Sequence, residues 1–287
     1  MRRRSAGLLA MAIALAPASV VMADGPPAAW TAPHKPFHVV GPIDYVGTEG
    51  IAVYLIHTKA GLILLDSGPA GAVPVVERNI AALGYHLRDV KIILATHAHW
   101  DHVAGVAALK RNTGARLLAS VGDRGALESG RPPSEYLDGE TSTFPPVKVD
   151  ATLTDGKPVR LGEVAMTPVL TPGHTPGCTS WTMQVRENGR PLTVIFPCSI
   201  TVAGNKLIGN TGYPGIVADF RASFARLGKL KADVMLPAHP EFADVLGRAK
   251  RRDAGDTIAF VAPQALGQLV ATSKVAFEQE LKRQEQP

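Results

Sequence analysis

After residue 23 the sequence has no apolar run long enough to cross a membrane, since a spanning helix needs about 18 uninterrupted apolar residues. It also lacks a basic run with interleaved aromatic residues, the usual pattern of a nucleic-acid-binding segment. No histidine-rich tract of the kind found in metal-buffering proteins is present. These absences predict a mature chain without a membrane anchor and without a nucleic-acid partner.

The first 23 residues have the pattern of a secretory signal peptide. A basic start (MRRR) precedes an apolar stretch at 6–21, and Val21-Met22-Ala23 forms a small-x-small cleavage signature before Asp24. We therefore expect residues 1–23 to be removed on export to the periplasm, leaving one domain at 24–287. Cleavage would leave 27 basic and 25 acidic residues, so the net charge would fall from +5 to +2. The chain has two cysteines, Cys178 and Cys198, and an even number in an oxidising compartment favours one disulfide.

Hydrophobic periodicity predicts a single α/β domain in which strands and helices alternate through two similar halves. Each half has a histidine-bearing loop at the end of a strand. A Pro- and Ala-rich arm at 24–37 precedes the first half, and a Gly/Pro-rich loop follows a short helix within 121–148. Strands are expected at 37–41, 51–58, 61–68, 90–96 and 115–120, and helices at 73–85, 102–114, 215–230 and 262–284.

The segment HAHWDH at 97–102 carries four metal-ligating side chains within six positions. His97 and His99 are two apart at a strand end, which places them on one face. Asp101 and His102 follow where a helix should begin, so that they can face a neighbouring point. Imidazole and carboxylate are typical zinc ligands, and this segment could therefore start two metal sites. Two further histidines lie in turns after apolar strands, His174 in TPGHTPG and His239 in LPAHP, whereas the remaining histidines lack such surroundings and are interpreted as surface or packing residues.

The combination of H-x-H-x-D-H, G-H-T-P-G and a late histidine in a P-x-H turn resembles the metallo-β-lactamase superfamily over 38–287. The resemblance implies a four-layer αββα sandwich with two zinc ions at the edge of its sheets. The first zinc would be held by His97, His99 and His174, the second by Asp101, His102 and His239. A hydroxide bridging the two ions would be the nucleophile, oriented by Asp101 as the catalytic carboxylate. Asp66, in the LLDSG motif, would orient a histidine ligand through that histidine's other nitrogen.

The resemblance also narrows the branch of the superfamily. Many thioesterases, lactonases and phosphodiesterases of this fold carry a bridging aspartate on the strand after the third histidine, but residues 193–205 contain no acid. Two β-lactamase subclasses use a cysteine ligand in this segment, for which Cys198 is a candidate. Those subclasses lack a metal-binding histidine directly after the motif's aspartate, where this chain has His102. The pattern is similar to the third subclass, which implies that Ser199 and Thr201 bind the substrate carboxylate.

Cys198 then requires another partner. Asn188-Gly189 is a strong two-residue hairpin signal, and a turn centred there puts Cys178 one position out of direct register with Cys198. We therefore predict a Cys178–Cys198 disulfide, which is also a feature of some members of the third subclass.

The predicted function is hydrolysis of the β-lactam amide of penicillins, cephalosporins and carbapenems by a monomer that acts on a small-molecule substrate with two zinc ions. No Ser-x-x-Lys motif is present to supply a serine nucleophile. Two alternatives remain: another hydrolase of the same fold, acting on lactones, thioesters, or sulfate or phosphate esters, and a non-enzymatic zinc-binding protein.

Overall fold

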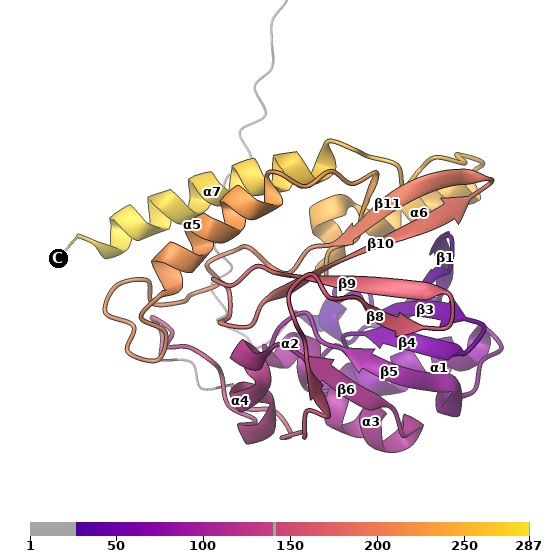
Figure 1. The fold of residues 1–287 in the computed structure, drawn as a ribbon, viewed down its shortest axis with the longest axis horizontal. Helices are drawn as coiled ribbons and strands as arrows, with labels where there is room; N and C mark the ends of the chain where they lie inside the picture. Colours follow the sequence, from indigo (N-terminus) through magenta and orange to yellow (C-terminus); the bar gives the residue numbers. More distant parts are fainter. Residues whose placement is uncertain (1–26, 140–141, 287) are drawn as a thin grey trace, which may run out of the picture.

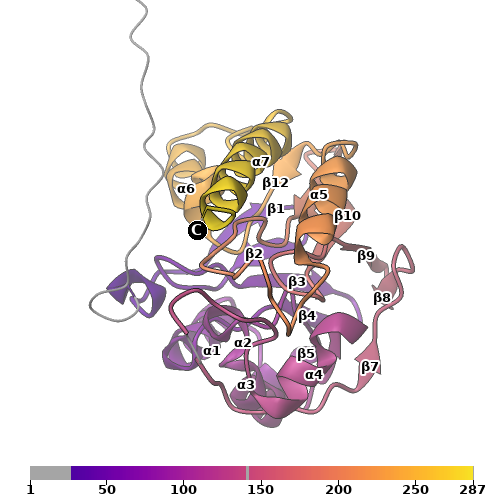
Figure 2. The same ribbon diagram turned by 90° about the vertical axis from the view of Figure 1, so that its left-hand side faces the viewer.

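The computed structural model describes residues 27–139 and 142–286, and the expected signal peptide at 1–23 lies outside these ranges. Two β-sheets face each other, and helices cover both outer faces (Figure 1). Helices α1 to α4 lie over the first sheet and α5 to α7 over the second, and the perpendicular view in Figure 2 shows the same four layers. The expected single-domain αββα sandwich is confirmed.

Each sheet is built from a nearly continuous part of the chain. The first sheet has the order β1-β2-β3-β4-β5-β6-β7, with the strands Phe37–Val40, Ile43–Tyr45, Tyr54–Thr58, Gly61–Leu65, Val90–Leu94, Arg116–Ala119 and Ala151–Thr152. The second has the order β12-β11-β10-β9-β8, and in chain order β8 to β12 span Val159–Leu161, Val164–Leu170, Thr179–Glu187, Arg190–Phe196 and Val234–Met235. The helices α1 to α7 span Val73–Ala82, Trp100–Val103, Val106–Thr113, Val121–Ser129, Ile216–Leu227, Val245–Asp253 and Ala265–Gln284.

Strand β4 shows why this part of the sequence is apolar without alternation. Ile63 and Leu65 point into the core shared with the second sheet, while Leu62 and Leu64 pack under the helices of the first sheet. A strand covered on both faces needs apolar side chains at every position. Because β4, β5 and β6 run parallel, their carboxyl ends meet at one edge of the sheet, and the histidine-rich segment starts from that edge.

The helix expected at 102–114 is broken into α2 and α3 around Gly105. The carbonyl of His102 does not continue a helical ladder, because it accepts hydrogen bonds from the backbone N–H and the hydroxyl of Ser67, at 2.9 and 2.8 Å. Gly105 donates its N–H to the carbonyl of Gly68 at 3.2 Å, and a Cβ there would lie 2.8 Å from a methyl group of Val73. Tertiary contacts with the segment after β4 therefore interrupt a locally helical sequence.

Helix α6 was not expected from the sequence, because its residues VLGRAKRRD include a glycine and few apolar side chains. The other two helices of this layer, α5 and α7, lie close to their expected ranges and pack side by side through aromatic rings. Although α7 runs for 20 residues, no helix in the described ranges is apolar enough over such a length to cross a bilayer.

The hairpin of β10 and β11 turns at the predicted dipeptide. Asn188 and Gly189 both have positive φ, 50° and 79°, as a tight two-residue turn requires. The ladder pairs Glu187 with Arg190 and continues without a register shift to its far end. Cys178 and Cys198 lie just beyond that end, where they form a disulfide with their Cα atoms 5.8 Å apart, as the sequence predicts.

Candidate metal centre

The segment 97–102 lies at the carboxyl end of β5, beside the end of β4. Its first residues form a loop and α2 begins at Trp100, so its four candidate ligands leave the chain from two differently oriented elements. His174 lies between β9 and β10 of the second sheet, and His239 follows β12. Both sheets thus end at one rim of the sandwich, where the six candidate ligands form two groups of three.

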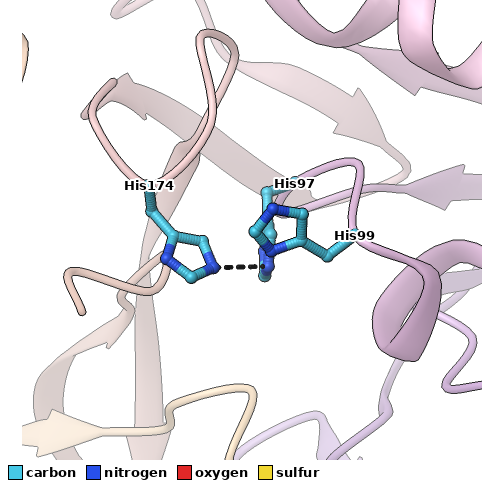
Figure 3. Close-up of side chains that lie close together, drawn as sticks. All are labelled: His97, His99 and His174. Carbon is cyan, nitrogen blue, oxygen red and sulfur yellow. Dashed lines mark hydrogen bonds between the residues drawn. The ribbon is translucent and has the colours of Figure 1, made fainter. Parts of the chain in front are cut away.

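The first group consists of His97, His99 and His174, whose ligand atoms all lie within 4.8 Å of one another. Figure 3 shows the three imidazoles close together. The Nε2 atoms of His97 and His174 are 3.1 Å apart. Two nitrogens bound to one tetrahedral zinc at about 2.0–2.1 Å are about 3.3 Å apart, so this spacing fits one ion. Burial lowers the pKa of all three imidazoles, to about 4 for His99. They are therefore neutral at neutral pH and can offer lone pairs to a cation.

Hydrogen bonds fix which nitrogen of two of these rings faces inward. Nδ1 of His174 donates a hydrogen bond to the carbonyl of Thr201 at 2.7 Å, so Nε2 is the nitrogen with a free lone pair for a metal ion. The hydroxyl of Thr96 donates to Oδ2 of Asp66 at 2.7 Å, and it therefore accepts from Nδ1 of His97 at 3.0 Å. Asp66 thus orients His97 indirectly, through Thr96. A partner on the outer nitrogen is the usual way in which proteins set the tautomer of a metal-binding histidine.

The third ring, His99, is held from the loop that follows α4. Its Nε2 lies 2.6 Å from the hydroxyl of Tyr136, so Nδ1 is the atom left to bind a metal ion. The carboxylate of the neighbouring Glu135 accepts hydrogen bonds from Lys206, the hydroxyl of Thr211 and two backbone N–H groups at 211–212. The loop is therefore tied to the segment after β11 on one side and to the metal centre on the other.

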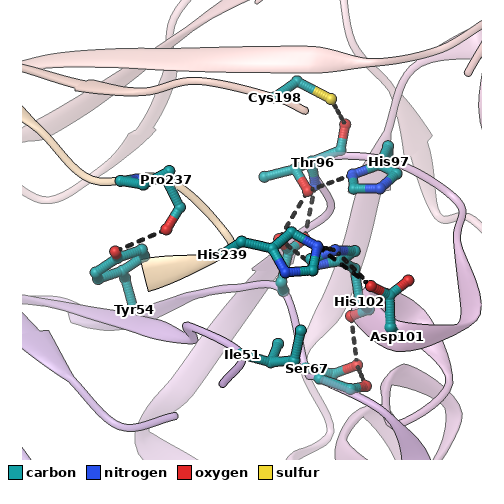
Figure 4. Close-up of polar contacts among 12 residues, drawn as sticks. Ile51, Tyr54, Ser67, Thr96, His97, Asp101, His102, Cys198, Pro237 and His239 are labelled. Carbon is teal, nitrogen blue, oxygen red and sulfur yellow. Dashed lines mark hydrogen bonds and ion pairs between the residues drawn. The ribbon is translucent and has the colours of Figure 1, made fainter. Parts of the chain in front are cut away.

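The second group consists of Asp101, His102 and His239 (Figure 4). The Nε2 atoms of the two histidines are 3.2 Å apart, and Oδ2 of Asp101 lies 3.0 Å from Nε2 of His102 and 3.4 Å from Nε2 of His239. The buried Nδ1 of His102 has no hydrogen-bond partner among the described residues, and Oδ2 of Asp66 lies 3.8 Å away, beyond hydrogen-bond reach. The two predicted ligand sets therefore each converge on a point, while Asp66 contacts Thr96 more closely than it contacts His102.

The electrostatics of the second group favour a positive charge. Burial alone would raise the pKa of Asp101, but the charge and hydrogen bond of His102 hold it well below its ordinary value. Conversely, burial would lower the pKa of His102, yet Asp101 raises it. The carboxylate of Asp101 thus favours a positive charge beside it. Neutral imidazoles and one carboxylate are the donor set that zinc prefers, so the residues fit that ion.

The residues predicted to contact substrate lie at the rim of the centre. The hydroxyls of Ser199 and Thr201 are 3.2 Å apart, and both residues line a hollow with His239, Phe242 and Leu269. Because Cys198 is bonded to Cys178, its sulfur is not a thiolate ligand.

The N-terminal arm closes one side of the second group. The ring of Trp30, in a short 3-10 helix at Ala28–Trp30, lies 5.5 Å from the ring of Trp100 and 5.7 Å from that of His239. Thr48 fastens the arm by donating its hydroxyl proton to the carbonyl of Trp30 at 3.0 Å.

Two contributors were not identified from the sequence. Thr96 directly precedes His97 but is part of the apolar strand run, where a hydroxyl is unremarkable. Tyr136 lies in a Gly/Pro-rich loop with no periodic pattern that could indicate a role for it. Only its contact with His99, 37 residues earlier in the chain, indicates its place at the centre.

A family-profile comparison matches residues 46–239 to the "Metallo-beta-lactamase superfamily". Among solved structures, the subclass B3 metallo-beta-lactamase BJP-1 of Bradyrhizobium japonicum is 42% identical, with a TM-score of 0.85, 90% of this chain covered and 97% of that one. The FEZ-1 metallo-beta-lactamase from Legionella gormanii is 34% identical, with a TM-score of 0.83 and coverage of 89% and 98%.

Among curated proteins, a hydroxyacylglutathione hydrolase of Methylococcus capsulatus is 33% identical over 125 residues, which are 44% of this chain and 40% of that protein. A second hydroxyacylglutathione hydrolase, from Cereibacter sphaeroides, is 36% identical over 126 residues, with coverage of 43% and 40%. The chain thus spans about two fifths of the length of these curated relatives.

Proposed function

This chain belongs to the metallo-beta-lactamase superfamily, and from that membership we propose that it is a zinc β-lactamase that hydrolyses the amide bond of penicillins, cephalosporins and carbapenems. Its similarity to B3 β-lactamases extends over about nine tenths of the chain at 34–42% identity. Its similarity to hydroxyacylglutathione hydrolases covers 43% or 44% of the chain at 33–36% identity, and 69% in one case at 26% identity. The proposal therefore follows the relatives that match the whole domain.

The observation that carries the proposal is the composition of the second group. His102 is available there as a ligand, Cys198 is committed to a disulfide, and residues 193–205 hold no acid that could bridge two metals. The bridging-carboxylate hydrolases of this fold need such an acid, so its absence favours a centre built only from histidine and Asp101.

Each residue then has a definite role. The first zinc would be held by the group of His97 and the second by the group of His102. Bound zinc supplies Lewis acidity, which polarises a carbonyl group and lowers the pKa of water to about 7. Asp101 would orient the attacking water by accepting a hydrogen bond from it, and Ser199 and Thr201 would donate hydrogen bonds to the substrate carboxylate. Tyr136 and Thr96 would keep the imidazoles in the tautomers that metal binding needs.

The test is a substrate panel on one zinc-loaded preparation of residues 24–287. We expect imipenem and benzylpenicillin to be hydrolysed, activity to be lost with EDTA and restored by zinc, and clavulanate to have no effect. His97→Ala should abolish turnover, while His86→Ala, on the surface away from both groups, should retain it. Zinc-loaded protein that is inactive on every β-lactam class would overturn the proposal.

The second candidate function is thioester hydrolysis, which the hydroxyacylglutathione hydrolase relatives favour. The same panel should include a hydroxyacylglutathione thioester, a lactone and a phosphodiester. Turnover of the thioester at a kcat/KM at least tenfold above that of every β-lactam would favour this candidate.

We also propose that residues 1–23 direct export to the periplasm, that the mature domain comprises 24–287, and that it acts as a monomer. The basic and apolar composition of the leader and the disulfide support export. N-terminal sequencing of the protein from a periplasmic extract should begin at Asp24. Expression in a susceptible bacterium should raise its resistance to β-lactams, and variants without the leader should lose that effect.

A further inference from the structure

Asp123 is a buried carboxylate to which neither the sequence motifs nor the proposed mechanism gives a role. It is the third residue of α4, which begins after Ser120, and only 2% of its surface is exposed. The hydroxyl of Ser120 accepts a hydrogen bond from the backbone N–H of Asp123, which caps the helix. The helix start is therefore fixed independently of the metal ligands.

The carboxylate of Asp123 joins the two loops that carry the first group of ligands. Oδ2 accepts hydrogen bonds from the backbone N–H of Ala98 at 2.8 Å and from the hydroxyl of Thr175 at 2.9 Å, and Oδ1 accepts from the N–H of Gly177 at 2.8 Å. Ala98 lies between His97 and His99, and Thr175 directly follows His174. One side chain thus links segments that are 77 residues apart and hold all three imidazoles.

No other described group accepts a hydrogen bond from the N–H of Ala98 or Gly177. Both are buried, and a buried N–H without an acceptor carries its full desolvation cost. The packing also brings the two backbones together, because a Cβ at Gly177 would overlap the hydroxyl of Ser120 and the backbone nitrogen of Asp123. The short distance between loop and helix therefore depends on this carboxylate and on the glycine opposite it.

The second group does not depend on Asp123 in this way. None of the hydrogen bonds of Asp123 goes to Asp101, His102 or His239. The carbonyl of His102 is held by the hydroxyl of Ser67 at 2.8 Å, while Asp66 binds the N–H and hydroxyl of Thr96 beside His97, at 2.7 Å each. The contacts that hold the second group therefore do not involve Asp123.

We propose that Asp123 is a positioning residue for the first metal site, which holds the loops of His97 and His174 at the separation that lets both imidazoles bind one ion. The inference rests on the metal centre of the proposed function, but not on the substrate. It predicts that loss of the carboxylate selectively weakens the binding of one zinc ion and leaves the binding of the other unchanged.

The experiment measures the two zinc dissociation constants by competition with a chromophoric chelator, and metal content by mass spectrometry. Asp123→Asn keeps the shape but turns an NH₂ group toward the donors. We expect one of the two zinc dissociation constants to rise at least tenfold and the other to change less than threefold. Asp233→Asn is the matched control, because that carboxylate accepts from the N–H of Thr193 at 2.8 Å away from both groups. It should leave both constants within threefold.

Two backgrounds assign the weakened ion. In a His239→Ala background, which disrupts the second group, Asp123→Asn should raise the dissociation constant of the remaining zinc at least tenfold. In a His97→Ala background, which disrupts the first group, Asp123→Asn should change the remaining dissociation constant less than threefold. Thr175→Val, which removes only one of the three hydrogen bonds, should give a smaller effect of the same kind. That variant provides the test if Asp123→Asn does not fold.

Equal weakening of both ions, or a lowered thermal midpoint of the metal-free protein with both constants unchanged, would overturn the inference. Wild-type protein that binds no zinc would overturn the inference and the metal centre together. Selective zinc loss in a protein that hydrolyses no β-lactam would support the inference while refuting the proposed function.

Discussion

Reducing the disulfide between Cys178 and Cys198 should destabilise the protein by about 3 kcal/mol. This magnitude follows from the length of the loop that the disulfide closes. The cysteines are 20 residues apart in sequence. In the chain-entropy treatment, a cross-link over a loop of this length removes about 11 cal/mol/K from the unfolded chain, which is about 3.3 kcal/mol at 25 °C. Both sulfur atoms are buried at the end of an intact ladder, so reduction changes few native contacts.

The assay is urea unfolding of metal-free wild-type protein, oxidised and fully reduced, followed by circular dichroism. Metal is removed because zinc bound to free thiols of the unfolded chain would distort the comparison. With a slope of about 3 kcal/mol per molar urea, the midpoint should fall by about 1 M on reduction. In calorimetry the transition should fall by about 6 °C for a domain of this size.

A double variant, Cys178→Ala with Cys198→Ala, controls for the reductant, because its midpoint should be the same in both conditions. A difference below about 1 kcal/mol between oxidised and reduced wild type would refute the reasoning that the cross-link acts through the unfolded chain.

Three further outcomes are expected. EDTA should lower the thermal midpoint of zinc-loaded protein, since an ion at about 1,000 times its Kd adds about 4 kcal/mol to the free energy of unfolding. Differential scanning fluorimetry should show a smaller EDTA-induced shift for His97→Ala than for the wild type. An equal shift in the two proteins would contradict this prediction. The carboxylate of Asp44 raises the pKa of His38, so this pair stabilises below pH 6.5, and its contribution disappears as pH rises through the raised value. His38→Gln should therefore lower the free energy of unfolding at pH 5.5 but not at pH 8.5. The loss should be less than about 1 kcal/mol, because solvent screens the pair. An equal loss at both pH values would contradict this prediction. Phe277 is 1% exposed and packs against two phenylalanine rings of α5. Phe277→Ala should lower the free energy of unfolding in urea by about 3–5 kcal/mol, whereas Val275→Ala on the exposed face of α7 should lower it by less than about 0.5 kcal/mol. Similar losses for the two variants would contradict the packing.

The local features of the chain follow from the sequence. Period-two and period-3.6 patterns identified most strands and helices, and Asn188-Gly189 located the hairpin turn because only a few residues accept positive φ at both positions. Apolar strands that end in His97 or His239 predicted ligands at strand ends, since a strand end is where a buried chain reaches the surface. Helix α6 was missed because its sequence lacks an apolar stripe, and Gly105 broke a predicted helix because Ser67 captures a carbonyl from outside it.

By itself, the sequence determined which side chains could bind metal and, through the motif resemblance, in which fold they would do so. The tertiary structure decided which nitrogen of each imidazole faces inward and which groups hold it there. Tyr136 and Thr201 hydrogen-bond to ligands that lie 37 and 27 residues away in the chain. Asp123 hydrogen-bonds to Ala98 and Gly177 in the ligand-bearing loops, 25 and 54 residues away. Hydrogen bonds over such separations depend on how loops pack against each other, and no local periodicity records that packing.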